Sequence, residues 1–532
     1  MVWKFGKSGM NNLSKSFLLI SALVLASCAN LPTDFEKTPT HAVTGTENTQ
    51  MGKNAAQVLG TSTDESRSFL INEGTDAFVA RMATLQLAEK SIDVQYYIWH
   101  ADIIGSYLFD SMLSAADRGV RVRILLDDMP IDKETQSILY AMDQHENIEV
   151  RLYNPFASRG FHLLDFLFSG PRINRRMHNK SFTVDNQVTI VGGRNIGNEY
   201  FSADEESNFA DIDVLSVGPV VEDVTKQFDV YWNSDVVYPV KAFDHNQANA
   251  EDLGQLRGKF ADFIKTNENS KYALDIRDTD MYKHINDSST WSPYQENTYS
   301  GKLQVIYDDP EKGLGKSEDE IVFLISLMKP YLEDVTISFE LVSPYFVPGK
   351  DGVQYLAGLV EKGIKVRVLT NSLSSTDGIM AQSGYSRHRR RLLEGGVEIY
   401  ELKADSKTKA SRSLRRSGKA KSGLHAKTYI FDRESIFIGS FNFDQRSANI
   451  NSEVGIVYEI PEMAELIGTS VFEKSLREHT FRVELSDTNP GKIEWVEYKD
   501  GVEMRHSKDP YTSGWRRFNE SIFSILPIES QL

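Results

Sequence analysis

The chain has 532 residues, of which 40% are hydrophobic and 25% are charged. This length and composition are typical of a folded protein with two or three domains. The formal net charge is −16. Because binding through counterion release needs clustered lysine and arginine, this acidic balance disfavours a nucleic-acid-binding protein, and no nucleic-acid partner is expected.

The N-terminus has the features of a secretion signal. Lys15 precedes an apolar run over residues 17–25, which is too short to span a bilayer. The run ends in Leu25-Ala26-Ser27-Cys28, which resembles a bacterial lipobox, where the cysteine becomes the lipidated first residue. We therefore expect a signal peptide over residues 1–27 and a lipid anchor at Cys28 that holds the protein on a membrane, facing the periplasm. An ordinary cleaved signal peptide is the alternative.

Cys28 is the only cysteine of the chain. Removal of residues 1–27 takes away three lysines and no acid, so the net charge falls from −16 to −19. Acylation of Cys28 leaves no free thiol, which excludes disulfides, a cysteine nucleophile and cysteine-based metal sites. The histidines outside the motifs described below, such as His100, His162 and His388, lack metal-ligand spacing. We expect no metal and no other cofactor.

Residues 29–65 are rich in small, polar and acidic residues and have no apolar periodicity, so we predict a lipidated N-terminus and flexible tether over 28–65. A helix with Phe78, Met82 and Leu85 on one face follows. After it the patterns predict a strand over 91–99, a second helix and a strand over 118–126. This order is typical of a βαβ unit in an α/β protein.

The same order returns in the second half of the chain. The patterns predict strands over 335–339 and 362–370 with a helix over 353–362 between them, and Gly119 and Gly363 are 244 residues apart. The sequence therefore predicts an internal duplication into two α/β lobes, each a mixed β-sheet flanked by helices. We place the lobes at 66–245 and 301–480, with a helical and loop connection over 246–300 and a C-terminal extension over 481–532.

One motif occurs once in each lobe, with an offset of 247 residues. The first copy has His178, Lys180 and Asp185, then Gly192-Gly193 and Asn195; the second has His425, Lys427 and Asp432, then Gly439-Ser440 and Asn442. Both copies continue into β-like residues, and residues two apart on a strand share a face, so each histidine projects with its lysine. A single match could arise by chance, but two copies at one offset indicate function.

These residue types predict a phosphate site. One imidazole can attack while the other gives and takes protons, because the ring titrates near neutral pH. Lys180, Lys427, Asn195 and Asn442 supply donors for a compact anion. The charge that develops on phosphoryl oxygens is then stabilised without a metal.

The duplicated motif resembles the signature of the phospholipase D superfamily. More narrowly, six segments are similar to the C-type bacterial cardiolipin synthases: residues 93–99, 174–182, 192–197, 343–348, 438–444 and 525–529. The resemblance extends from about residue 75 to the end of the chain. It implies two phospholipase D-like lobes with the active site at their interface.

The resemblance also implies roles for the motif residues. His178 attacks the phosphodiester phosphorus and forms a phosphatidyl-histidine, by analogy with relatives in which the first motif attacks. His425 protonates the leaving alcohol and then deprotonates the incoming one. The two lysines and Asn195 and Asn442 hold the phosphoryl oxygens.

Each histidine needs an acid that orients its second ring nitrogen. Glu453 fits one of these roles and Asp211 the other, with Asp213 in reserve. Asp185 and Asp432 belong to the signature, but we expect them to support the fold away from the phosphate rather than to act as acids or bases.

The function implied by the resemblance is that of a membrane-attached phosphatidyltransferase. It makes cardiolipin from phosphatidylglycerol and a phosphatidyl donor, phosphatidylethanolamine. The alternatives are a phospholipase D that transfers the phosphatidyl group to water, a nuclease of the same superfamily, and a non-catalytic lipid-binding lipoprotein. The expected partners are membrane phospholipids and the membrane surface; an accessory protein, the oligomeric state and the choice of inner or outer membrane stay open.

Three further segments could contact a membrane. The basic run from Lys403 to Lys421 is predicted to be a mobile loop, with anionic headgroups as the alternative contact. The apolar residues 161–168 fit a core segment and a lipid-facing lip equally. The amphipathic tail over 515–526 is predicted to pack on the body, with membrane contact as the alternative.

Overall fold

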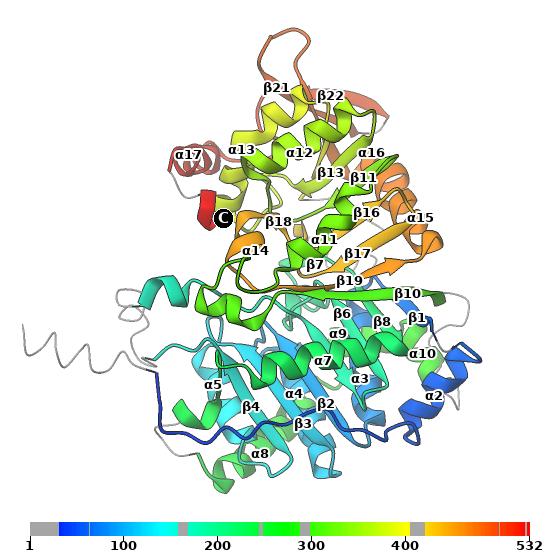
Figure 1. Cartoon of the computed structure of the whole chain (residues 1–532), viewed down its shortest axis with the longest axis vertical. Helices are drawn as coiled ribbons and strands as arrows, with labels where there is room; N and C mark the ends of the chain where they lie inside the picture. Colours follow the sequence, from blue (N-terminus) through cyan, green and yellow to red (C-terminus); the bar gives the residue numbers. More distant parts are fainter. Residues whose placement is uncertain are drawn as a thin grey trace, which may run out of the picture.

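The computed structural model describes residues 31–62, 64–157, 169–243, 248–287, 298–404, 421–499, 501–526 and 529–532. The N-terminal lobe forms the lower half of the molecule in Figure 1 and the C-terminal lobe the upper half. The expected signal peptide, Cys28, the apolar segment 161–168 and most of the basic run lie outside the described residues.

The N-terminal lobe is built on one mixed sheet. Its strand order is β9-β4-β3-β2-β5-β6-β8-β1, with β2, β3 and β4 parallel to one another. The bounds are β1 (Ser66–Ile71), β2 (Ser91–Tyr96), β3 (Arg121–Asp127), β4 (Ile148–Tyr153), β5 (Ser181–Val184), β6 (Val188–Gly192), β8 (Asp213–Val217) and β9 (Val237–Pro239).

The sheet of the C-terminal lobe repeats this order as β20-β14-β13-β11-β16-β17-β19-β10. The bounds are β10 (Thr298–Tyr307), β11 (Ser338–Val342), β13 (Lys365–Asn371), β14 (Glu398–Leu402), β16 (Thr428–Phe431), β17 (Ser435–Gly439), β19 (Val454–Glu459) and β20 (Thr480–Leu485). The correspondence of the two sheets, strand by strand, confirms the duplicated α/β fold. The prediction of a strand over 335–339 was three residues early, since β11 begins at Ser338.

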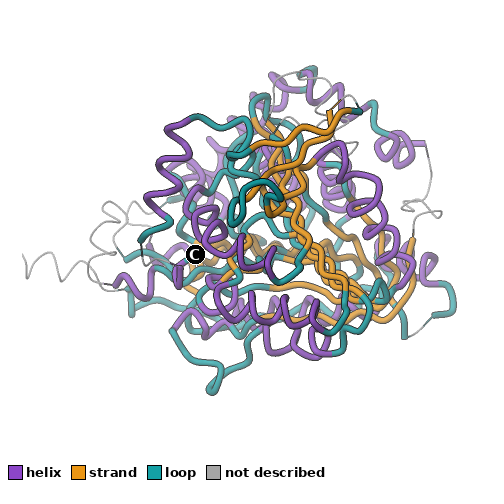
Figure 2. The backbone as a smooth tube through the Cα atoms, turned by 90° about the horizontal axis from the view of Figure 1, so that it is seen from above, coloured by secondary structure: helices purple, strands orange, loops and turns teal. Residues whose placement is uncertain are grey.

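One strand joins the two sheets. The start of β10 pairs with β1 of the N-terminal lobe, and the rest pairs with β19 of the C-terminal lobe. In Figure 1, β10 runs between the lobes, and Figure 2 shows strands through the middle of the molecule with helices around them. Apolar side chains from both lobes, including Val191, Val214, Ile436 and Ile456, form a common cluster. The lobes are therefore joined by backbone pairing and by a shared core.

Helices cover both sheets. Those of the N-terminal lobe are α3 (Gly74–Leu87), α4 (Ile103–Asp117), α5 (Lys133–Met142) and α7 (Pro219–Asn233), followed by α8 (Ala250–Asn267), α9 (Lys271–Arg277) and α10 (Asp280–Asp287) of the predicted connection. Those of the C-terminal lobe are α11 (Leu324–Glu333), α12 (Gly349–Glu361), α13 (Ile379–Glu394), α14 (Gln445–Asn449), α15 (Pro461–Thr469), α16 (Leu476–His479) and α17 (Gly514–Phe523). Gly119 and Gly363 adopt positive φ angles of 92° and 85°, which turn the chain from helix into strand in each repeat.

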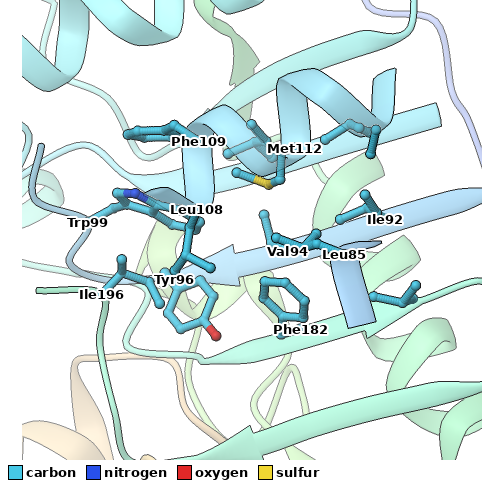
Figure 3. Close-up of a cluster of buried hydrophobic side chains, with 14 of the residues drawn as sticks. Leu85, Ile92, Val94, Tyr96, Trp99, Leu108, Phe109, Met112, Phe182 and Ile196 are labelled. Carbon is cyan, nitrogen blue, oxygen red and sulfur yellow. The ribbon is translucent and has the colours of Figure 1, made fainter. Parts of the chain in front are cut away.

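The core of the N-terminal lobe lies between β2 and the helices α3 and α4 (Figure 3). Val94 of β2 points toward Met112 of α4, whereas the Tyr96 ring points away from Met112 in this view; these three side chains and Leu108 are buried. Trp99 stacks on Phe109 with ring centroids 4.8 Å apart. This packing fixes β2, with which β5, the strand between Lys180 and Asp185 of the first motif, pairs.

The prediction of a flexible tether over 29–65 was wrong for its described part. Residues 31–47 run along the N-terminal lobe to the helix α2 (Gln50–Leu59), as the dark blue segment of Figure 1 shows. Lys37 Nζ donates to the Ser234 carbonyl at 2.7 Å, and Arg151 and Arg123 donate to the carbonyls of Thr38 and Thr40. The contacts use backbone carbonyls, which every residue has, so the side-chain pattern carried no sign of them.

The predicted C-terminal extension begins inside the second sheet. β20 pairs with β14, and the antiparallel strands β21 (Ile493–Lys499) and β22 (Val502–His506) extend the sheet from there. Helix α17 lies on α13 beside the C-terminus (Figure 1). Within the described residues, no helix combines the length and apolar character needed to cross a bilayer.

Candidate active site

The two motifs meet at the interface of the lobes, and each histidine is held by the other lobe. His178 N donates to the Ser452 carbonyl at 2.8 Å, and His425 N donates to the Ala210 carbonyl at 2.8 Å. The second contact extends a parallel pair of strands, β7 (Ser207–Ala210) and β15 (Lys421–Leu424). Both histidines and both motif lysines are buried.

The orienting acids are exchanged between the lobes in the same way. His178 Nδ1 lies 2.8 Å from Glu453 Oε2, and His425 Nδ1 lies 2.6 Å from Asp211 Oδ2. A carboxylate can only accept, so each Nδ1–H donates. The Nε2 lone pair of His178 is then left for chemistry, whereas Nε2 of His425 accepts from Lys427 Nζ at 3.0 Å. Asp213, the reserve candidate, pairs instead with Arg81 at 2.8 Å.

The electrostatics of the site favour neutral imidazoles. Burial and repulsion from Lys180 lower the pKa of His178 to about 4, although Glu453 opposes the shift. Burial and Lys427 lower the pKa of His425 to about 4, against Asp211. Near neutral pH both rings are therefore uncharged, and a neutral ring is the nucleophilic form.

The lysines lie beside the histidines. The ammonium of Lys180 donates to the His178 carbonyl, and that of Lys427 donates to the His425 carbonyl at 2.5 Å. Burial and the Lys427 charge hold the pKa of Lys180 well below its usual range, and burial lowers the pKa of Lys427 to about 8. Two like charges in one buried site repel each other, so an anion between them relieves the strain.

The two amides are also buried here. Asn195 Oδ1 accepts from the Ile98 backbone amide at 3.2 Å, and the backbone N–H of Asn442 donates to Ser447 Oγ at 3.3 Å. Asn442 Oδ1 has no hydrogen-bond partner among the described atoms, although the side chain is buried. The unpaired atom is an acceptor, so it is suited to a hydroxyl or other donor group of a ligand, while a phosphoryl oxygen would need the Nδ2 end of the side chain.

Asp185 and Asp432 lie at the far ends of β5 and β16, away from the histidines. Asp185 accepts from the amides of Glu89, Lys90 and Ser91, and Asp432 from those of Thr336, Ile337 and Ser338. Each stands at a positive φ, 50° and 52°. The two carboxylates tie the motif turn to the start of a neighbouring strand.

Some contacts were missed from the sequence. Ser440 Oγ donates to Glu453 Oε2 at 2.5 Å, whereas the corresponding Gly193 leaves room for Asp211, since a Cβ there would lie 2.2 Å from Asp211 Oδ1. The Gly/Ser difference between the two motifs was the available signal.

Two residues that end equivalent strands hold the chain just before each motif histidine. Asp127 Oδ2 accepts from the Met177 amide at 2.8 Å, and Asn371 Oδ1 accepts from the Leu424 amide at 2.9 Å. Asp127 and Asn371 lie 244 residues apart, the same offset as Gly119 and Gly363. This shared offset could have identified them from the sequence.

Aromatic rings complete the walls. The Tyr97 ring lies 5.3 Å from that of His178, and the Tyr200 ring lies 5.0 Å from that of His425. Among the residues that the structure describes, no cluster of three or more histidine, cysteine or acidic side chains could hold a metal ion. The arrangement offers a nucleophile, a proton donor and paired cations for a phosphoryl group.

Comparison with known proteins decides the family. Residues 82–232 and 331–474 match the family model described as "Cardiolipin synthase, PLD-like domain". The chain belongs to this family. His178 lies in the first matched segment and His425 in the second. The match confirms the resemblance seen in the sequence.

Among relatives of this cardiolipin synthase-like chain, Cardiolipin synthase C of Escherichia coli (strain K12) is 40% identical over 472 residues, which cover 87% of this chain and 95% of the relative. An uncharacterised protein of Helicobacter pylori (strain ATCC 700392 / 26695) is 31% identical and covers 90% of this chain and 92% of its own. Among solved structures, a phosphatidylserine synthase of Haemophilus influenzae Rd KW20 aligns with a TM-score of 0.53 at 15% identity, over 81% of this chain and 91% of that one. This last likeness supports the fold alone.

Proposed function

We propose that the chain is a phosphatidyltransferase that makes cardiolipin through a phosphatidyl-histidine. The observation that carries the proposal is the pair of exchanged histidine–carboxylate contacts, His178 with Glu453 and His425 with Asp211, around two buried lysines. The 40% identity to Cardiolipin synthase C supports the choice of reaction within the family.

In the first step, Nε2 of neutral His178 attacks the phosphorus of the donor lipid. A nitrogen–phosphorus bond forms, the bond to the headgroup oxygen breaks, and His425 gives its proton to that oxygen. The phosphate anion between Lys180 and Lys427 opposes the effect of burial and raises the pKa of His425, so the proton is available once the lipid is bound. Glu453 stabilises the positive charge that develops on His178.

In the second step, His425 takes the proton from a glycerol hydroxyl of phosphatidylglycerol. The freed oxygen attacks the phosphorus, the bond to His178 breaks, and cardiolipin leaves. The proposed donor is phosphatidylethanolamine, which releases ethanolamine. Lys180, Lys427, Asn195 and Asn442 hold the phosphoryl oxygens in both steps, where charge-assisted donors are most effective.

The proposed location is the periplasmic face of a membrane. A signal peptide over residues 1–27 directs export, and acylated Cys28 holds the chain at the lipid surface. Packing of residues 31–47 on the N-terminal lobe keeps the catalytic body within a few residues of this anchor.

The proposal is tested by lipid analysis in a host that lacks cardiolipin synthases. The host expresses the parent chain, His178→Ala, His425→Ala or the control His41→Ala, with phosphatidylethanolamine labelled in its phosphatidyl part as the tracer. His41 is mostly exposed, 73%, and lies on the N-terminal segment. We expect labelled cardiolipin with the parent and the control, and none with either motif variant. Phosphatidic acid without cardiolipin would make the protein a phospholipase, and unchanged lipids would contradict both.

A further inference from the structure

Helix α17 carries its apolar stripe on the outside. Trp515, Phe518 and Ile522 follow the helical spacing of three and four residues, and they are 69%, 54% and 44% exposed. Ile525, just after the helix, is 82% exposed, and no residue of α17 is buried. A surface helix ordinarily turns its apolar stripe to the core, so this arrangement is the reverse of the usual one.

Polar contacts fix the helix in this orientation. Arg516 Nε donates to the Leu373 carbonyl at 2.6 Å, and its second nitrogen donates to the Thr376 carbonyl at 2.5 Å. Glu520 accepts from the Ser386 hydroxyl of α13. The exposed stripe is therefore presented by a helix that is attached to the body through its polar face.

The helix is attached next to the active site. The segment that Arg516 holds begins just after Asn371, whose Oδ1 accepts from the Leu424 amide next to His425. It leads into Asp377, whose carboxylate accepts from Tyr345 Oη at 2.9 Å and whose charge raises the pKa of Lys427 against the effect of burial. The end of the chain also lies beside the first motif. Asn174, four residues before His178, donates to Gln531 Oε1 at 2.7 Å. Figure 1 shows α17, the C-terminus and α14 on one side of the molecule.

We propose that the apolar stripe formed by Trp515, Phe518, Ile522 and Ile525 docks on a phospholipid surface and holds the active site against it. Trp515 and Phe518 stack with ring centroids 5.6 Å apart, and tryptophan is enriched where a protein meets the headgroup region of a bilayer. An amphipathic helix that lies in this plane buries one apolar face, which is what α17 offers.

A second copy of the chain fits the stripe less well than a bilayer does. A stable interface buries about 800 Å² on each partner, whereas four partly exposed side chains supply only a few hundred. A bilayer needs no complementary surface, and the inferred substrates are themselves bilayer components. The inference goes beyond the proposed function, because it assigns the segment that sets the height of the site above the membrane.

The first test reads orientation with a fluorophore. An environment-sensitive label is attached to Phe518→Cys or to the control Val502→Cys, in the full chain with Cys28→Ser so that each label has a single thiol. Val502 is 61% exposed on β22. With phosphatidylglycerol–phosphatidylethanolamine vesicles that contain brominated acyl chains, we expect at least 2-fold quenching at position 518 and none at 502.

Equal quenching at both positions, or none at 518 while the protein floats with the vesicles, would overturn the proposal. So would a spectral shift at 518 that follows protein concentration without vesicles, because that result would indicate a second copy. The readout needs no turnover, so it separates a failure of docking from a failure of the proposed reaction.

The second test compares two triple variants. Trp515, Phe518 and Ile522 are changed to serine in one, and the similarly exposed Val322, Leu466 and Val502 in the other. We expect the α17 variant to lose about 10-fold or more of its turnover on vesicles, because apolar burial drives insertion, and less than 2-fold on detergent-dispersed lipid. The control variant should stay within 2-fold on both. Equal losses on vesicles by the two variants would contradict docking through α17.

Discussion

Glu453→Gln tests the proposed role of the exchanged acids. The change keeps the size of the side chain and an oxygen that can accept from His178 Nδ1, now 2.8 Å from Oε2, and it removes only the charge. A hydrogen bond to a charged group contributes about 1.5–3 kcal/mol and a neutral one about 0.5–1.5 kcal/mol, so the direct loss is about 1–1.5 kcal/mol.

The charge also acts through space in the transition state. Two unit charges about 4 Å apart at an effective dielectric constant of about 20 attract by about 4 kcal/mol, which sets the upper limit. The expected loss in kcat is therefore about 5-fold to 1000-fold. Because Glu453 raises the pKa of His178 against the effect of burial, the variant should also move that pKa below its value of about 4.

The assay is single-turnover transfer from labelled donor lipid, with the covalent intermediate trapped by rapid quenching and the His178 pKa followed by NMR. Glu398→Gln is the matched control, since Glu398 lies at the start of β14 and is exposed. Glu453→Gln with a kcat within 2-fold of the parent, at unchanged melting temperature, would refute the reasoning. A loss in kcat without a change in the pKa of His178 would move the role of Glu453 from charge to packing.

Three further outcomes are expected. Asp185→Asn should lower the free energy of unfolding by about 1–3 kcal/mol, because its carboxylate accepts from three backbone amides. The kcat per folded molecule should stay within 2-fold of the parent. Urea unfolding measures the first effect, and active-site titration with kinetics measures the second. Gly193→Ala should reduce kcat at least 10-fold, because the new Cβ displaces Asp211. The control Gly254→Ala, which has open space around it, should leave kcat unchanged. A normal kcat for Gly193→Ala would contradict the role of Asp211 in orienting His425. Sulfate binding near pH 6.5 should take up protons, because both motif histidines are neutral above about pH 4 and a bound anion raises their pKa. Calorimetry in buffers of different ionisation enthalpy measures the uptake. His178→Ala should reduce it.

The duplication and its strands were predictable because apolar alternation and one fixed offset describe local structure. β5 and β16 both begin one residue after a motif lysine, at Ser181 and Thr428, and the α/β architecture follows from such repeats. The contact of Glu453 with a histidine was expected, yet the sequence could not assign it to His178 across the lobe interface. That assignment depends on the joining of the sheets by β10, whose polar and apolar residues reveal no partner strand.

The N-terminal segment was mispredicted for a different reason. Its apolar residues are few, and its attachment depends on the guanidinium groups of Arg123 and Arg151, which donate to its backbone carbonyls. The donors belong to β3 and β4, distant in the chain, so no local pattern records the match. The same limit applies to α17, whose stripe was visible in the sequence while its outward direction was set by the Arg516 contacts.

The exchange of the orienting acids between the lobes has a consequence for the evolution of the chain. A gene for one lobe alone would encode a histidine without its carboxylate and a carboxylate without its histidine, so such a half would gain a complete site only as a symmetric dimer. Fusion of two copies turns a concentration-dependent assembly into an intramolecular one. It also frees the two halves to diverge, and Gly193 opposite Ser440 is a visible product of that freedom.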